Sequence, residues 1–141
     1  MLDQKMIDKL IETAVDMTKK SYAPYSDFKV GAALLAKNGQ IFTGCNIENA
    51  AYTPTNCAER TAFFKAVSEG EREFEAIAVE GGERGEISGI FPPCGVCRQV
   101  MLEFCDPDFK IYMGTADGYE TAVLADLIPY GFTSGQHMQK K

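Results

Sequence analysis

Three cysteines and one glutamate stand at spacings that could perform metal chemistry. The stretch "PPCGVC" places Cys94 and Cys97 three residues apart, so at the start of a helix both sulfurs point the same way and can share one ion. The stretch "TNCAE" places Cys57 two residues before Glu59, at a second predicted helix start. Three thiolates leave one position of a tetrahedral zinc open to water, and a neighbouring glutamate can move protons for that water.

The cysteine pair by itself admits three interpretations. A thioredoxin-type redox pair needs only Cys94 and Cys97, a structural zinc site needs four ligands, and a catalytic zinc site takes three. Cys57 favours the catalytic site, because the macrodipoles of two helix N-termini stabilise thiolates. Cys45 ends a predicted strand and Cys105 ends a predicted helix, so we expect both to be buried small apolar residues. If either were a fourth ligand, the zinc would be structural.

Glu59 also has a purely structural interpretation. With Asn56 as N-cap, "NCAE" matches a capping box, in which the glutamate only accepts a hydrogen bond from the backbone N–H of the cap residue. With Cys57 as a metal ligand, Glu59 would instead lie on the first helical turn beside the metal. The residues alone leave both interpretations open.

Composition excludes several classes of function. The chain has 141 residues and a net charge of −6 without a cluster of basic residues, so it would repel the phosphate backbone of nucleic acid. The only histidine, His137, lies in the polar tail "SGQHMQKK", which argues against a histidine-based hydrolase triad. No apolar run is long enough to cross a membrane, and the N-terminus is charged where a signal peptide is apolar. We therefore expect a cytoplasmic protein that binds neither nucleic acid nor membrane.

Hydrophobic periodicity predicts the elements that must position these residues. An amphipathic helix is predicted near 3–20, and a strand over 28–36 is apolar on both faces, as expected at the centre of a sheet. The other predicted elements are strands at 41–45, 74–81 and 109–113, helices at 57–67 and 94–104, a loop over 82–93, and a short final element over 121–129. This order predicts an α/β fold in which helices cover both faces of a mixed sheet. Length predicts one domain over 1–141, with 130–141 as a partly flexible tail.

Longer stretches of the chain resemble a known family. "NCAERTAFFKAVSEG" followed by "PPCGVCRQV" is similar to the zinc nucleoside deaminases, and particularly to the small three-cysteine cytidine deaminases. The similarity extends through "YAPYSDFKVGAALL" and "TGCNIENAAYTPTNCAERTA" to "EFCDPDFKIYM", roughly residues 20 to 115. The resemblance implies a three-layer α-β-α sandwich with a mixed five-stranded sheet, one zinc ion per chain and a homotetramer. It also implies hydrolysis of free cytidine and 2'-deoxycytidine to uridine and 2'-deoxyuridine, with release of ammonia, in pyrimidine salvage.

The resemblance assigns roles to the metal-site residues. Cys57, Cys94 and Cys97 match the zinc ligands, and Glu59 matches the residue that carries a proton from the zinc-bound water to ring nitrogen 3 while hydroxide attacks carbon 4. Arg60 resembles the arginine that hydrogen-bonds the ligand sulfurs. A solvated helix arginine is the alternative for Arg60.

Six substrate contacts follow from the same resemblance, at Phe28, Asn46, Glu48, Tyr52, Ala58 and Phe132. Asn46 and Glu48 are implied to bind the ribose hydroxyls, with a polar loop as the alternative. Phe28, which the strand pattern alone would place in the core, is implied to stack on the pyrimidine. Tyr52 and Phe132 are implied to reach a pocket across a subunit boundary, with surface packing as the alternative.

The chain departs from the family at one place. Relatives often have Ser-Pro before the first cysteine of the pair, whereas this chain has Pro92-Pro93, and the preceding loop over 81–91 is long and glycine-rich. We expect this departure to affect which substituents the pocket admits. Competing functions are a deaminase of another aminopyrimidine or of a nucleoside-like antibiotic, a structural zinc module, and a thiol oxidoreductase.

Overall fold

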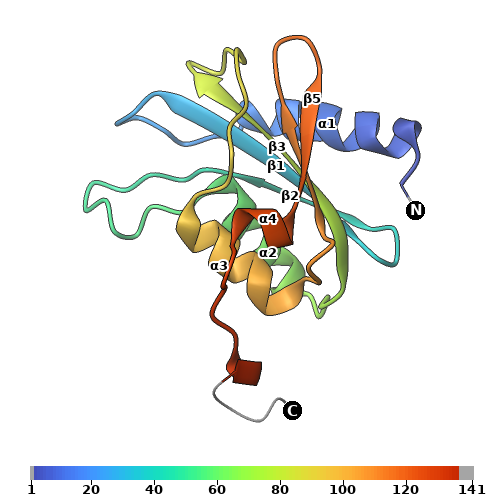
Figure 1. Ribbon diagram of the computed structural model, residues 1–141. Helices are drawn as coiled ribbons and strands as arrows, with labels where there is room; N and C mark the ends of the chain where they lie inside the picture. Colours follow the sequence, from blue (N-terminus) through green and yellow to red (C-terminus); the bar gives the residue numbers. More distant parts are fainter. Residues whose placement is uncertain (1, 137–141) are drawn as a thin grey trace.

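A mixed five-stranded sheet lies between helices on both of its faces in the computed structural model, which describes residues 2–136 (Figure 1). The strand order is β2-β1-β3-β4-β5, and β3 and β4 are the parallel pair. The strands are β1 Phe28–Ala36, β2 Ile41–Cys45, β3 Phe74–Glu83, β4 Lys110–Gly114 and β5 Tyr119–Val123. The helices are α1 Gln4–Thr18, α2 Ala58–Ser68, α3 Gly95–Phe104 and α4 Leu124–Leu127, with a short 3-10 turn at Ser134–Gln136. The predicted three-layer sandwich is confirmed.

Two apolar cores lie on the two faces of the sheet. Alternate residues of β1 point to opposite faces, so Leu34 packs with α2 and α3 while Leu35 packs with α1. This double burial explains why the strand reads as a continuous apolar run. Helix α1 begins at its N-cap Asp3, whose carboxylate accepts a hydrogen bond of 2.9 Å from the backbone N–H of Met6.

Three details differ from the sequence prediction. The central strand is β3, and β1 lies beside it. Strand β3 also continues two residues beyond its predicted end to Glu83, because Gly82 and Glu83 pair with Lys29 and Phe28 of β1. The predicted final element consists of two parts, the edge strand β5 and the single-turn helix α4.

The start of α2 is set by its contact with β2. A Cβ atom at Gly44 would overlap the carbonyl oxygen of Ala58 and lie 2.6 Å from the backbone N of Ala62. Glycine at this position therefore lets the first turns of α2 pack directly on the strand. This close approach holds Cys57, the N-cap of α2, at one end of the sheet.

None of the helices described over 2–136 combines the length and apolar character needed to span a membrane. His137 and the last part of the predicted 130–141 tail lie outside the described residues.

Candidate metal centre and active site

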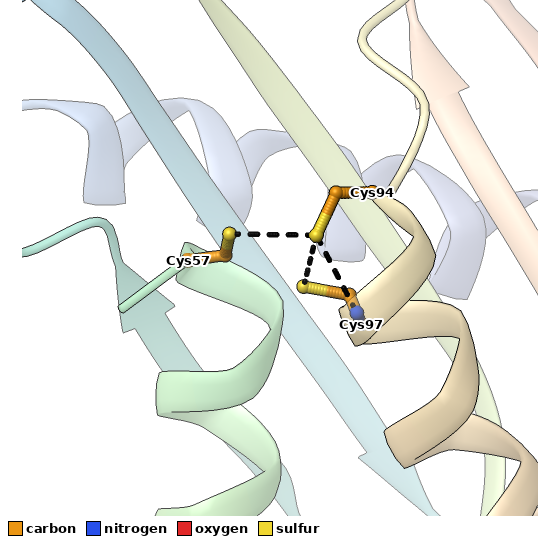
Figure 2. A group of neighbouring side chains, drawn as sticks. All are labelled: Cys57, Cys94 and Cys97. Atoms are coloured by element: carbon orange, nitrogen blue, oxygen red, sulfur yellow. Dashed lines mark hydrogen bonds between the residues drawn. The ribbon is translucent and has the colours of Figure 1, made fainter. Parts of the chain in front are cut away.

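The sulfur atoms of Cys57, Cys94 and Cys97 converge at the N-termini of two helices (Figure 2). Cys57 is the N-cap of α2 and Cys94 is the N-cap of α3. The Sγ atoms are 3.7 Å apart between Cys57 and Cys94 and 3.5 Å apart between Cys94 and Cys97, and all three lie within 4.8 Å of one another. Two segments that are far apart in the chain thus supply one three-thiol cluster.

The electrostatics of the cluster favour a cation. The hydrogen bond from Cys97 is the largest cause that lowers the pKa of Cys57, and Arg60 also lowers it, to about 5. The same hydrogen bond with Cys57 is the main cause that raises the pKa of Cys97, so the proton stays on Cys97. Three cysteine sulfurs at this spacing form a donor set that suits zinc, and zinc binding would release the proton of Cys97.

Arg60 lies next to the cluster rather than in solvent. Its Nη2 donates a hydrogen bond of 3.2 Å to Sγ of Cys57, and its Nε is buried without a hydrogen-bond partner in the part of the chain that the structure describes. The geometry agrees with the role that the family resemblance implies for Arg60. A guanidinium beside thiolates offsets part of their charge.

The other two cysteines stand apart from the cluster. Cys45 is buried at the end of β2, and its thiol donates a hydrogen bond of 3.4 Å to the carbonyl oxygen of Lys20. Cys105 is the half-buried C-cap of α3. Burial raises the pKa of both thiols, which keeps them protonated. Among the described residues, the metal-competent group therefore has three protein ligands and does not include a fourth cysteine.

Glu59 is the second residue of α2 and is 2% exposed. Desolvation by burial is the largest cause that raises the pKa of its carboxyl group, to about 7. The capping-box interpretation is wrong, because the N-cap is Cys57 and the N–H of Asn56 donates instead to the carbonyl oxygen of Ile47, at 2.9 Å. Glu59 therefore does not form a capping box with Asn56, and a hydrogen bond with the backbone of Glu59 itself partly offsets the rise in the pKa of its carboxyl group.

A cavity of about 470 Å³ adjoins the cluster. Its wall is mostly apolar, and it is lined by Ser26, Phe28, Val30, Asn46, Glu48, Thr55, Asn56, Cys57, Ala58, Glu59, Phe91, Pro92 and Cys94. This volume suits a small organic molecule. Four of the six predicted substrate contacts, together with Glu59, line this cavity: Phe28, Asn46, Glu48 and Ala58.

Asn46 and Glu48 also hold the backbone in place. The Oδ1 of Asn46 accepts a hydrogen bond of 2.9 Å from the N–H of Val30, and its Nδ2 donates to the carbonyl oxygen of Phe28 at 2.7 Å. Glu48 accepts hydrogen bonds from the N–H groups of Tyr25 and Ser26 at 2.9 and 3.1 Å. The hydroxyl of Ser26 also donates to Glu48 and is the largest cause that lowers the pKa of this carboxylate. These hydrogen bonds thus hold both side chains in fixed positions at the cavity wall. The polar-loop alternative does not predict such fixed positions.

Tyr52 and Phe132 do not line this cavity within one chain. Tyr52 is exposed, has a positive φ of 62° and packs edge-on against Tyr25 with ring centroids 6.2 Å apart. Phe132 is also exposed, and its carbonyl oxygen accepts a hydrogen bond of 2.9 Å from Nε2 of Gln99. Their assignment to a substrate pocket stays a prediction that depends on a second subunit.

Phe91 lines the cavity and was missed by sequence reasoning. It lies in the segment predicted as a loop, where no periodicity marks a buried side chain. The aromatic residue directly before Pro92-Pro93 was the available signal.

A three-thiol cluster beside a buried glutamate and an apolar cavity, on an α-β-α sandwich, is the arrangement expected of a metal-dependent hydrolase of small molecules. Residues 4–113 match the family described as "Cytidine and deoxycytidylate deaminase zinc-binding region", and the chain belongs to this family. Cytidine deaminase of Sporosarcina psychrophila is 50% identical over 128 residues, which are 90% of this chain and 91% of the relative. Cytidine deaminase of Halalkalibacterium halodurans is 48% identical over 94% of this chain and 96% of the relative. The crystal structure of cytidine deaminase from Burkholderia pseudomallei superposes with a TM-score of 0.82 at 47% identity, covering 89% of this chain and 98% of that one.

Proposed function

We propose that the protein is a zinc-dependent cytidine deaminase that converts free cytidine and 2'-deoxycytidine to uridine and 2'-deoxyuridine. The observation that carries this proposal is the convergence of three cysteine sulfurs within 4.8 Å of one another beside the cavity that Glu59 also lines. Water is consumed and ammonia is released, so the reaction needs an activated water and a group that moves protons.

The ligands in this proposal are Cys57, Cys94 and Cys97, and the resident ion is zinc. Zinc held there would act as a Lewis acid that makes water a nucleophile near neutral pH. Arg60 offsets the negative charge that three thiolates bring, through its hydrogen bond to Sγ of Cys57. The two helix N-termini add to this effect.

Glu59 is the proposed catalytic residue. Its carboxylate takes a proton from the attacking water and delivers it to ring nitrogen 3 of cytosine. It then takes the proton of the new hydroxyl group on carbon 4 and passes it to the amino group, which leaves as ammonia while carbon 4 becomes a carbonyl. Burial suits this task, because a pKa near 7 lets one carboxyl group both accept and donate at neutral pH. The carboxyl group of Glu59 is buried, which limits the access of bulk water to that proton.

The substrate contacts in this proposal extend from the cluster to the outer wall of the cavity. The ring of Phe28 and the backbone of Ala58 contact the base, while Asn46 and Glu48 contact the ribose hydroxyls. Support for the ribose contacts is the rigid positioning of both side chains by β1 and the 25–26 segment.

A homotetramer is the proposed assembly. Aromatic side chains that include Tyr52, Tyr130 and Phe132 are exposed on the described surface, which supports burial against other subunits. Tyr52 and Phe132 would then complete a neighbouring pocket. We expect light scattering to give four times the chain mass and Phe132→Ala to lower kcat/KM. A fully active monomer would contradict the assembly.

A cytoplasmic location and a role in pyrimidine salvage complete the proposal. All five cysteines are free, and a thiolate metal site needs a reducing compartment to persist. The substrate in this proposal is a free nucleoside, which suits the recovery of pyrimidines.

The deciding experiment incubates the zinc-loaded protein with cytidine and follows loss of the cytosine absorbance together with ammonia release. Turnover of cytidine supports the proposal, whereas no turnover at full zinc occupancy would overturn it. Parallel reactions with 2'-deoxycytidine, free cytosine and a nucleoside-like antibiotic test the substrate class. A structural zinc module or a thiol oxidoreductase would bind metal or reduce a disulfide substrate without releasing ammonia.

A further inference from the structure

Arg98 follows the proposed ligand Cys97 in α3, and its side chain binds two backbone carbonyl groups. Its Nε donates a hydrogen bond of 2.8 Å to the carbonyl oxygen of Pro93, and its Nη1 donates one of 2.8 Å to that of Leu127. Both donors share the charge of the guanidinium, which strengthens such bonds. Pro93 directly precedes Cys94, and Leu127 ends α4, which lies beside α3 (Figure 1). One side chain thus joins the start of α3 to the end of α4.

Cys94 is the exposed member of the three proposed ligands. Cys97 is buried, and the half-buried Cys57 also accepts a hydrogen bond from Arg60. The Sγ of Cys94 accepts a hydrogen bond of 3.4 Å from the backbone N–H of Cys97 (Figure 2). Packing therefore restrains Cys94 less than it restrains the other two ligands, and the position of its sulfur depends more on the backbone to which it is attached.

Arg98 binds the backbone on both sides of Cys94. Its own N–H donates a hydrogen bond of 3.0 Å to the carbonyl oxygen of Cys94, while its side chain binds the carbonyl oxygen of Pro93. The rings of Pro92 and Pro93 fix φ at both residues, so the rotation of the Pro93 carbonyl is the main freedom left in the chain before Cys94. The guanidinium removes this freedom.

The second carbonyl group attaches this turn to the rest of the fold. Leu127 is the last residue of a single-turn helix, whose final carbonyl groups have no partner within the helix. Gln99 binds the same C-terminal segment further along, because its Nε2 donates a hydrogen bond of 2.9 Å to the carbonyl oxygen of Phe132. Arg98 differs from Gln99 in that it also binds the residue before Cys94.

We propose that Arg98 is a positioning residue that fixes Cys94 for the metal ion by joining the Pro93 carbonyl to the end of α4. The inference rests on the ligand set of the proposed function. A planar guanidinium with five donors binds two acceptors in fixed directions, whereas the ammonium group of a lysine is a point charge on a flexible stem. Lysine at this position therefore keeps the charge but fixes the turn less firmly.

The test measures zinc affinity by competition with a chromogenic chelator in Arg98→Met and Arg98→Lys. Loss of a residue that orients a metal ligand lowers metal affinity by about 10- to 100-fold. We expect a loss of this size in Arg98→Met and a smaller loss in Arg98→Lys. The visible spectrum of the cobalt-substituted protein reports the ligand geometry without turnover, and we expect it to change in Arg98→Met.

Two control variants separate positioning from general stability. Arg72 is an exposed arginine whose Nη1 donates to the carbonyl oxygens of Val67 and Glu71 at 2.7 and 3.1 Å, so Arg72→Met removes similar bonds away from the cluster. Gln99→Ala removes a bond between α3 and the C-terminal segment but none to the turn before Cys94. We expect wild-type zinc affinity and an unchanged cobalt spectrum in both controls.

Unchanged zinc affinity and cobalt spectrum in Arg98→Met would overturn the inference. An equal loss of affinity in Gln99→Ala would also overturn it, because attachment of the C-terminal segment would then explain both results. If circular dichroism shows that Arg98→Met does not fold, wild-type affinity and spectrum in Arg98→Lys would overturn it instead. Zinc binding requires no turnover, so the expected pattern of affinities without deamination of cytidine would support this inference and contradict the proposed function.

Discussion

Glu59 and Glu80 are two buried carboxyl groups on opposite faces of the same sheet, and only one of them has chemistry within reach. Each is 2% exposed, and desolvation raises the pKa of each to about 7. Glu80 follows Ala76 and Ala78 in the alternation of β3, so it points to the face covered by α1. Its Oε2 has no hydrogen-bond partner among the described residues.

The difference lies in what surrounds the two groups. Glu59 lines a cavity beside three sulfur atoms, whereas Glu80 fills the space that Gly114 of β4 leaves by having no side chain. A shifted pKa therefore marks burial on both faces, and on only one face does it accompany the proposed catalytic site. The neighbouring sulfur atoms and the accessible cavity distinguish Glu59 from Glu80, and four experiments test this difference.

The largest expected effect comes from removing a ligand, which would leave Glu59 with no activated water to deprotonate. We expect Cys94→Ala to lose bound zinc and to lower cytidine turnover to the level of a protein-free solution. Metal analysis and the ammonia assay measure both. The matched control is Cys105→Ala, whose thiol lies outside the cluster. Full activity of metal-free Cys94→Ala would contradict the assigned site.

The second test exchanges the two acids for their amides. Glu59→Gln removes the proton carrier and is expected to lower kcat by about 10²- to 10⁴-fold while zinc stays bound. Glu80→Gln is expected to keep wild-type kcat, because no part of Glu80 lines the cavity. Equal loss of activity in both variants would mean that burial, rather than position, governs the effect.

The third test fills the space beside Glu80. A Cβ atom at Gly114 would overlap its carboxylate, so Gly114→Ala should lower the free energy of unfolding by about 1–3 kcal/mol. Urea unfolding measures this change. In a Glu80→Ala variant the carboxylate is absent, so Gly114→Ala should lower the free energy of unfolding by a smaller amount. Additive effects in the double variant would show that the two positions do not interact.

The fourth test measures the pH dependence of stability, an effect that is confined to part of the pH range. The unfolded pKa of Glu80 is near 4.5 and the folded pKa is about 7, so ionisation opposes folding. The penalty is absent below the unfolded pKa, builds up as pH rises from 4.5 to 7, and is complete above the folded pKa. Glu80→Gln should therefore match wild type near pH 4.5 and exceed its unfolding free energy by about 1–3 kcal/mol at pH 8. A difference that does not grow with pH would show that Glu80 ionises freely in the folded protein.

Local patterns predicted most of the elements and the ligand set. The amphipathic spacing of α1 and the two-sided burial of β1 are visible in the chain because each depends on short-range periodicity. Cys57, Cys94 and Cys97 were identifiable because helix starts position thiols in a regular way. The end of β3 was predicted too early, because glycines at 81 and 82 usually indicate a loop, whereas here they pair with β1.

By itself, the sequence determined which side chains can bind a metal and the helix starts that carry them, since both depend on neighbours within a few residues. Tertiary structure alone decided that Glu59 does not complete a capping box, because the N–H of Asn56 that the capping box requires donates to the carbonyl oxygen of Ile47, nine residues earlier in the chain. It also decided that Phe91 lies beside Phe28 at the cavity and that Oε2 of Glu80 is buried without a hydrogen-bond partner among residues 2–136. These outcomes depend on contacts between distant segments, and side-chain type and spacing do not encode which backbone groups and which empty volumes those segments share.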